Sequence, residues 1–260
     1  MKKKLKMKCQ GLKKTTIVFF VCFLSLFITN RLLDVLIERT EVHFLIVSFV
    51  KLILIFFVFQ SLVNEQKKVS SLIKNWPIFS LIILFVVYFS YSDTHNIIAS
   101  DNLNINNYLH VSYIIECFAT GFFEEILCRV FLFYSLVNSN LFRIENRVFK
   151  SYITSSLIFA FCHITNLFQN DIFSVINQIL LAFGLGLIFQ ILFTKYKNLL
   201  FIASLHALIN YFGMRSSTLF QVKSIAEDVE LTNVLFNVGI FIFLDSIILF
   251  YVYLHIKKRV

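Results

Sequence analysis

The sequence predicts an all-α, polytopic transmembrane helical bundle with about eight spans. Of its 260 residues, 58% are hydrophobic, and the mean hydropathy is +0.79. Phe alone fills 33 positions, against one Pro and six Gly. A soluble domain is about 45–50% apolar, so a bilayer must solvate much of this surface. The length predicts one membrane domain over residues 1–260 and leaves little room for a second, soluble one.

Apolar segments long enough to cross or enter a bilayer recur along the whole chain. A transmembrane helix needs about 20 mostly apolar residues, and two of the segments, 77–91 and 199–212, are shorter. Short spans are tolerated where the bilayer thins or where a polar cavity adjoins. The eight predicted spans are Thr16–Ile37, Phe44–Val63, Pro77–Tyr91, Val111–Val137, Tyr152–Phe168, Ile172–Phe193, Leu199–Phe212 and Val234–Ile256.

The distribution of basic residues predicts the orientation of these spans. If the N-terminus is cytoplasmic and the spans alternate, cytoplasmic segments hold 18 Lys and Arg residues and external segments hold four, counting Arg31 near the external end of the first span. Basic residues concentrate on the cytoplasmic side of membrane proteins. We therefore expect both termini inside the cell, in a cell membrane. The residue usage, rich in Lys, Asn and Ile, favours a bacterial source.

The net charge of +9 has the same explanation. In a soluble protein it would favour a nucleic-acid partner, whereas here the basic residues anchor the ends of the spans. We expect the lipid bilayer as a partner and no nucleic acid.

Three charged residues fall together inside the fourth predicted span. They are Glu124, Glu125 and Arg129, and a charge at the bilayer centre costs about 2.5–3.5 kcal/mol on insertion scales. Glu125 and Arg129 are four residues apart on one helix face, so they predict an internal ion pair. Glu124 points about 100° away and needs another partner. Gly121, one turn earlier, would admit a substrate backbone or a close helix neighbour.

Two histidines and an asparagine lie at a similar predicted depth in other spans. His163 lies in the fifth span, and His206 and Asn210 lie in the seventh. A spacing of four puts His206 and Asn210 on one helix face. A lone membrane His is usually an interhelical hydrogen-bonding residue, but a set of two His, an Asn and a spare Glu favours a chemical site.

Peptide hydrolysis would use this set of groups. It needs a base that activates water and donors that stabilise the oxyanion. A buried Glu is suited to acid or base work, and His and Asn side chains can donate to an oxyanion. The chain has no Ser nucleophile elbow and no His-Glu-x-x-His zinc motif. Two His and one Glu would still suffice for a three-ligand metal site.

The three motifs resemble those of the CPBP family. They are Glu124-Glu125-x-x-x-Arg129, Phe159-x-x-x-His163 and His206-x-x-x-Asn210, each on a separate predicted span. The family comprises the CAAX proteases and bacteriocin-processing enzymes, also called Abi, and includes the Ras-converting CAAX endopeptidase. The resemblance implies an intramembrane endopeptidase with a catalytic core region at 111–212.

The resemblance also implies a role for each matched residue. Glu124 would activate the attacking water together with His163, and His206 and Asn210 would stabilise the oxyanion. Glu125 and Arg129 would support the site as an ion pair. Members are described both as metalloproteases and as glutamate proteases, so a divalent metal such as zinc, or none, stays open. A metal would take Glu124, His163 and His206 as ligands, with Glu125 as the base.

Two other functions stay open at this point. Some relatives act as bacteriocin self-immunity factors or membrane regulators, which bind and do not cleave. A proton-coupled transporter would also use buried carboxylates, although the chain lacks the repeats and broken helices of many transporters. For the enzyme, a pheromone precursor, bacteriocin precursor or membrane-protein segment is the expected substrate. Glu116 and Asp245 have no assigned role, and Lys51 is a candidate partner of Asp245.

Overall fold

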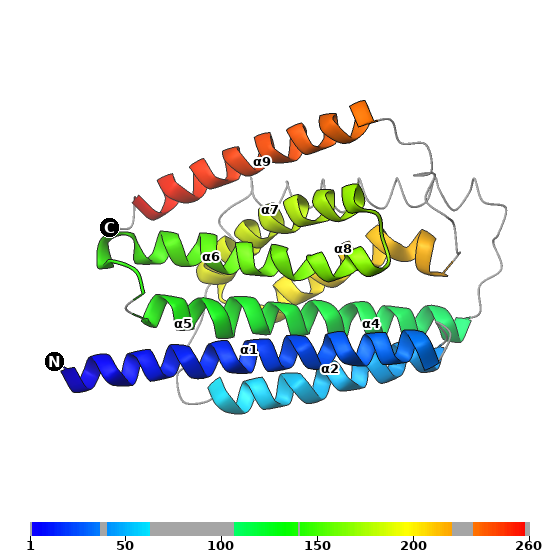
Figure 1. The fold of residues 1–260 in the computed structure, drawn as a ribbon, viewed down its shortest axis with the longest axis horizontal. Coiled ribbons are helices and arrows are strands. Elements are labelled where there is room, and N and C mark those ends of the chain that lie inside the picture. The colour runs from blue at the N-terminus through cyan, green and yellow to red at the C-terminus, as the bar shows by residue number, and fades with distance from the viewer. Residues whose placement is uncertain (1, 37–40, 63–106, 140, 220–230, 258–260) are drawn as a thin grey trace. The chain divides into compact units, whose positions relative to one another are not determined.

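The structure is a computed structural model that describes residues 2–36, 41–62, 107–139, 141–219 and 231–257. All regular elements in these ranges are helices (Figure 1). The chain divides into two compact units. The first contains Met1–Val21, Leu127–Lys195 and Asp228–Val260, and the second contains Cys22–Ile126 and Tyr196–Glu227.

The predicted spans correspond to helices wherever the structure describes them. Three helical segments are long and apolar enough to cross a membrane: Thr16–Leu33, Arg147–Phe168 and Ile172–Tyr196. Shorter apolar stretches occur at Val42–Phe56, Leu199–Arg215 and Val238–Leu254. The all-α prediction is thus confirmed for the described residues, whereas the count of eight spans stays a prediction. The predicted span Pro77–Tyr91 lies outside the described residues.

Three helices build the part of the second unit that matters for the site. They are α2 (Glu41–Leu62), α4 (Asn107–Glu125) and α8 (Leu199–Leu219). α4 packs against α2 and against α8. Near the start of α4, Tyr113 and Cys117 form a buried apolar cluster with Phe44 and Leu219. This cluster joins all three helices, so α4 is the central element.

The helix α8 extends beyond the predicted seventh span at its C-terminal end. The predicted span ends at Phe212, and α8 continues to Leu219. Its last turns are polar in sequence, and the buried Leu219 packs in the cluster with Phe44 and Tyr113. Tertiary packing therefore extends the helix beyond the apolar run. The helix begins where the Asn198 Oδ1 accepts a hydrogen bond from the Phe201 backbone N–H at 3.1 Å, an N-terminal cap.

The chain departs from α-helical geometry directly after Glu125. Residues Ile126–Leu132 (η1) form a π-helix, and α5 (Phe133–Asn138) resumes the α-helix. All seven residues of η1 are buried. π-helical segments are rare and occur frequently at functional sites.

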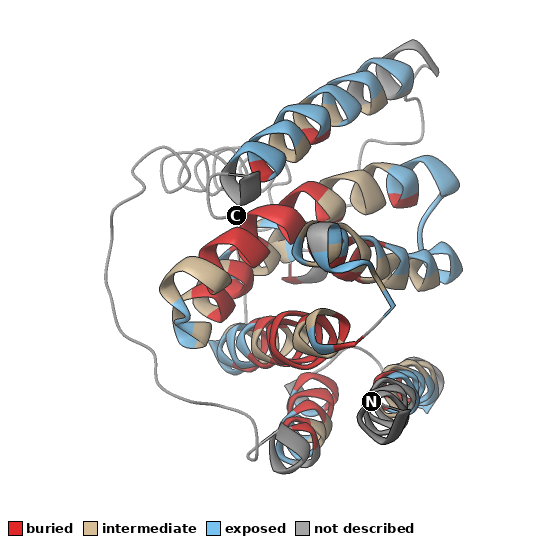
Figure 2. Ribbon diagram, turned by 90° about the vertical axis from the view of Figure 1, so that its left-hand side faces the viewer, coloured by how far each residue is buried: buried red, intermediate tan, exposed pale blue. Residues whose placement is uncertain are grey.

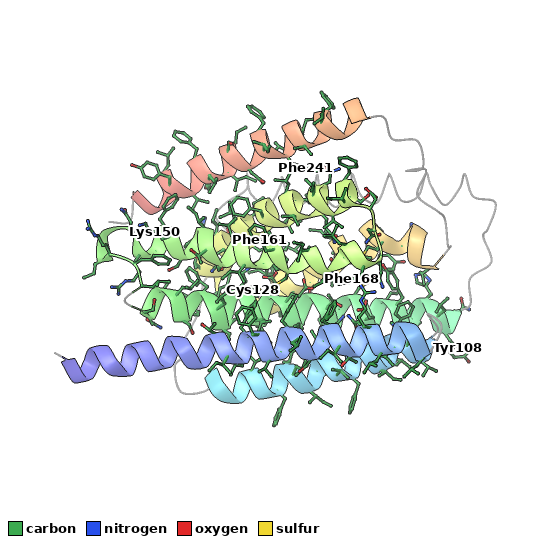
Figure 3. All side chains as sticks on the ribbon, viewed as in Figure 1. Tyr108, Cys128, Lys150, Phe161, Phe168 and Phe241 are labelled. Carbon is green, nitrogen blue, oxygen red and sulfur yellow. The ribbon has the colours of Figure 1, made fainter. Side chains whose placement is uncertain are left out.

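The first unit contains η2 (Ile144–Asn146), α6 (Arg147–Cys162), η3 (His163–Phe168), α7 (Ile172–Tyr196) and α9 (Leu231–Lys257). α6 packs against α5 and α9. Many large apolar residues of α9 are exposed, so its ribbon is largely pale blue in Figure 2, and Figure 3 draws its side chains as sticks. Exposed apolar faces on apolar helices are expected where lipid is the solvent.

Candidate active site

One histidine of the second unit contacts two consecutive glutamates. The Nδ1 of His206 lies 2.9 Å from the Oε1 of Glu125. Its Nε2 lies 3.3 Å from the Oε2 of Glu124. Consecutive helical side chains point about 100° apart. Both carboxylates, which are on α4, nevertheless reach the same imidazole ring, which is on α8. The structure therefore brings together three of the predicted site residues.

The two contacts differ in kind. The Nδ1 of His206 and the Oε1 of Glu125 form a hydrogen bond, in which the ring nitrogen donates to an ionised carboxylate. The Nε2 of His206 and the Oε2 of Glu124 lie at an ion-pair distance. Groups of this kind within reach of one another are what general acid–base catalysis needs.

The two carboxylates differ in their access to solvent. The side chain of Glu125 is 0% exposed, whereas that of Glu124 is 29% exposed. Both contact the nearly buried His206. Glu124 is thus the carboxylate that a substrate or water molecule can reach, and Glu125 holds the other side of the ring.

Gly121 allows α4 and α8 to approach closely enough for these contacts. A Cβ atom there would lie 2.8 Å from the Ala203 carbonyl oxygen and 2.9 Å from the Ala207 backbone nitrogen. Both neighbours are backbone atoms, so no side-chain movement would relieve the overlap. Of the two roles expected for Gly121, the structure shows the close helix neighbour. Small residues commonly permit such approach between membrane helices.

Asn210 lies one turn after His206 on α8. Its backbone carbonyl accepts a hydrogen bond from the Tyr113 hydroxyl at 3.3 Å. The next residue, Tyr211, has its hydroxyl 2.5 Å from the Nε2 of His110, and the two rings are parallel. Polar and aromatic contacts with α4 thus hold this turn of α8. The spacing predicted for His206 and Asn210 is present in the helix.

His163 lies in the first unit, where α6 ends. It is the first residue of the 3₁₀ helix η3, and its Nδ1 lies 3.1 Å from the Phe159 carbonyl oxygen. A carbonyl oxygen only accepts, so Nδ1 donates the hydrogen bond and Nε2 is the acceptor nitrogen in a neutral ring. The Phe159 ring meets His163 edge to face at 5.1 Å between centroids. The Phe-x-x-x-His spacing therefore orients His163 through both the carbonyl and the ring of Phe159.

Phe159 also contacts the third charged residue of the first motif. The guanidinium carbon of Arg129 lies 4.7 Å from the centroid of the Phe159 ring. Arg129 is fully buried in η1, and a desolvated cation–π contact is worth about 2 kcal/mol. The expected pairing of Arg129 with Glu125 stays a prediction.

Both site histidines have an acceptor oxygen beside their Nδ1 atom. Nδ1 faces Glu125 in His206 and a carbonyl oxygen in His163. Histidines that bind metals are usually held by a hydrogen bond of this kind at the second nitrogen, so the donor types fit the predicted ligand set Glu124, His163 and His206. Across the described parts of the chain, no three His, Cys, Asp or Glu side chains are grouped around one position.

Glu116 and Lys51 form a contact that the sequence did not reveal. The Nζ of Lys51 on α2 lies 2.5 Å from the Oε1 of Glu116 on α4. Lys51, which the sequence offered as a candidate partner of Asp245, thus contacts Glu116. Their separation of 65 positions along the chain leaves no local pattern to find.

Comparison with known proteins decides the family. Residues 106–212 match the family model described as "Type II CAAX prenyl endopeptidase Rce1-like". This domain belongs to the CAAX protease family. No curated protein and no solved structure matches the chain significantly.

The matched CAAX protease domain contains all six predicted site residues, from Glu124 to Asn210. It nearly coincides with the core region expected at residues 111–212. The family of the domain, together with the long apolar helices, indicates a membrane protein, and at the level of the family the domain is of the CAAX-type endopeptidase class. The class implies a peptide or protein substrate and a lipid environment.

Proposed function

We propose that the chain is an intramembrane endopeptidase that hydrolyses a peptide bond in a membrane-associated peptide or protein. The contacts of His206 with Glu124 and Glu125, at 3.3 and 2.9 Å, carry this proposal. An imidazole between two carboxylates is costly to place in a membrane protein, and ionisable groups that are kept at such a cost are usually functional. The family of the domain supports peptide hydrolysis as that use.

Glu124 is the proposed base that activates water. It is the more exposed carboxylate, and its contact with His206 gives it a partner for the proton that it takes. As the water oxygen attacks the carbonyl carbon, Glu124 removes one water proton and the carbonyl oxygen becomes an oxyanion. When the C–N bond breaks, the proton passes to the leaving nitrogen, which departs as an amine. Protons and charges balance without a further reactant.

The other five residues have supporting roles in this proposal. His163 assists Glu124 in activating the water through its Nε2. His206 and Asn210 donate to the oxyanion, which requires that the His206 Nε2 carries a proton at that step. Glu125 fixes the ring orientation of His206, and Arg129 provides a positive charge in the same motif. Removing an oxyanion donor typically lowers kcat by about 10²–10³-fold.

A divalent ion, if the enzyme binds one, would take Glu124, His163 and His206 as ligands. It would supply Lewis-acid polarisation of the substrate carbonyl and a lowered pKa of bound water. Glu125 would be the base in that version, although its full burial and its contact with His206 favour an orienting role. Elemental analysis of the purified protein distinguishes the two versions.

We further propose a bacterial cell membrane as the location, with both termini cytoplasmic. The 18 to four division of basic residues supports this orientation. A peptide pheromone or bacteriocin precursor is the proposed substrate, because such peptides are processed at the membrane. The base and the oxyanion donors alone would support hydrolysis of any peptide bond. The substrate specificity is therefore determined by other parts of the chain.

The test uses purified protein in liposomes, with candidate precursor peptides analysed by mass spectrometry. We expect cleavage by the wild type and none by Glu124→Gln or His163→Ala. Asp171→Asn is the matched control, because Asp171 is an exposed carboxylate outside the spans. Cleavage by all variants would contradict the proposal. If the wild type cleaves none of the peptides but confers bacteriocin immunity that survives Glu124→Gln, the binding function replaces the enzyme.

A further inference from the structure

The most unusual group outside the catalytic set is the lysine buried inside an apolar helix. Lys51 is 5% exposed and lies in the middle of α2. Its ammonium contacts the Glu116 carboxylate and the Thr120 hydroxyl, both on α4. The Thr120 hydroxyl is also 2.9 Å from the Oε1 of Glu116, so the three groups close a triangle.

This triangle resists sliding of the two helices. When one helix turns or shifts against another in lipid, contacts between apolar side chains lose little stabilisation, because lipid tails are as apolar as the side chains. The buried ammonium of Lys51 and the largely buried carboxylate of Glu116 behave differently, because separating them leaves each charge uncompensated. The Lys51–Glu116 pair therefore sets the axial position and the rotation of α4 against α2.

The rotation of α4 determines where Glu124 points. Glu116, Thr120 and Glu124 follow each other at intervals of four, so they lie along one stripe of the helix. Lys51 holds the first two members of the stripe, and the third contacts His206 at 3.3 Å. Gly121, also on α4, lies so close to the backbone of α8 that a Cβ atom there would overlap it. α4 is thus held between one electrostatic contact and one steric contact.

From these contacts we infer that Lys51 is a positioning residue for the proposed peptide hydrolysis: its ion pair with Glu116 places Glu124 against His206. The expected effect of Lys51 on catalysis rests on the proposed function. The expected effect of the Lys51–Glu116 pair on the Glu124–His206 contact does not, and it can be measured in a protein without activity. A purely structural ion pair would change stability when removed and leave that contact unchanged.

Kinetics in liposomes give the first test, with three variants and a control. Lys51→Met should lower kcat about 10–100-fold, the scale of a 1 Å misplacement of catalytic groups, with KM within about twofold. The exchange Lys51→Glu with Glu116→Lys should recover most of the loss. Lys51→Met with Glu116→Met should keep the melting temperature, since apolar pairs replace buried ion pairs well, but not kcat. Lys150→Met, an exposed lysine on α6, is the control.

The ¹⁵N NMR spectrum of the His206 ring gives a second test, which does not require an active enzyme. The His206→Gln variant assigns the ring signals, because they are missing from its spectrum. We expect both ring nitrogens to show hydrogen-bond shifts in the wild type, and the Nε2 signal to move in Lys51→Met and in the double Met variant. An unmoved Nε2 signal, or an undiminished kcat in the double Met variant, would overturn the inference. A moved signal in a protein that cleaves nothing would sustain the positioning and reject the proposed function. If Lys51→Met does not fold, the double Met variant decides both readouts.

Discussion

His206 Nδ1 lies 2.9 Å from Glu125 Oε1, and this contact fixes which nitrogen of His206 faces the more exposed Glu124. The ring cannot turn over without exchanging one carboxylate for the other. The contact supports the proposed role of Glu125 as the group that orients His206. The first prediction follows from this difference between the two glutamates.

Glu125→Gln should lower kcat about 10–100-fold, the usual effect of losing a residue that orients a catalytic histidine. Glu124→Gln should lower it more, about 10²–10⁴-fold, because the base itself is lost. Single-turnover cleavage in liposomes measures both. Equal losses in the two variants would remove the distinction between base and orienting group.

Gly121→Ala should separate α4 from α8. The added Cβ would lie within 2.9 Å of two backbone atoms, and overpacking of this kind costs about 1–3 kcal/mol. We expect a lower melting temperature and a loss of cleavage. Gly213→Ala on α8 is the matched control, because a Cβ there meets nothing within 4 Å. It should be neutral or stabilise the helix by roughly 0.5–1 kcal/mol. Full activity in Gly121→Ala would show that the close approach is not needed.

Phe159→Ala should impair the site without removing any polar group. The variant keeps the carbonyl that accepts from His163 but loses the ring against which His163 and Arg129 pack. Loss of a buried Phe side chain costs about 3–5 kcal/mol, so melting and kcat should both fall. Phe161→Ala, an exposed Phe on the same helix, should change neither measurably. Similar melting temperatures for the two variants would contradict this role.

Asp171 should make the start of α7 sensitive to acid. Its Oδ1 accepts hydrogen bonds from the backbone N–H groups of Phe173 and Ser174, both at 2.9 Å, and its Oδ2 accepts one from the Ser174 hydroxyl. Hydrogen bonds from the Ser174 side chain, followed by those from the backbone, lower the pKa of the Asp171 carboxyl. A lowered folded-state pKa gives stability that is complete above the unfolded value of about 3.9 and lost as pH falls through the folded value.

Asp171→Ala should therefore lose about 0.5–2 kcal/mol near neutral pH, the usual value of a helix cap. The difference from the wild type should vanish in strong acid. Asp171→Asn should keep most of the cap at every pH. Thermal unfolding in detergent from pH 7 to pH 2 measures all three proteins. A difference that persists unchanged at the lowest pH would exclude the ionised carboxylate as its source.

The sequence predicted the polar part of the site because charges are costly in apolar helices. Glu124, Glu125 and His206 are conspicuous there, and a helical spacing of four relates His206 to Asn210. Their partners were harder to predict. Helical spacing points Glu125 at Arg129, but it gives no sign that His206 from another helix lies beside Glu125.

Features that depend on contacts between distant segments were missed. Lys51 and Glu116 meet across 65 positions, and no local pattern signals their pairing. The π-helix after Glu125 consists mostly of apolar residues, as an α-helical span would, so hydropathy does not distinguish the two kinds of helix. The polar end of α8 reads as a loop until its packing through Leu219 is known.

The most direct test of the account asks whether Glu124 and His206 act as one unit. Single-turnover cleavage rates in liposomes would be measured for Glu124→Gln, His206→Gln and the double variant. Residues that move one proton together are strongly non-additive. We predict that the double variant is no slower than the slower single variant, within about threefold. Losses that multiply in the double variant would show that the two residues act independently, and would contradict a shared catalytic cluster.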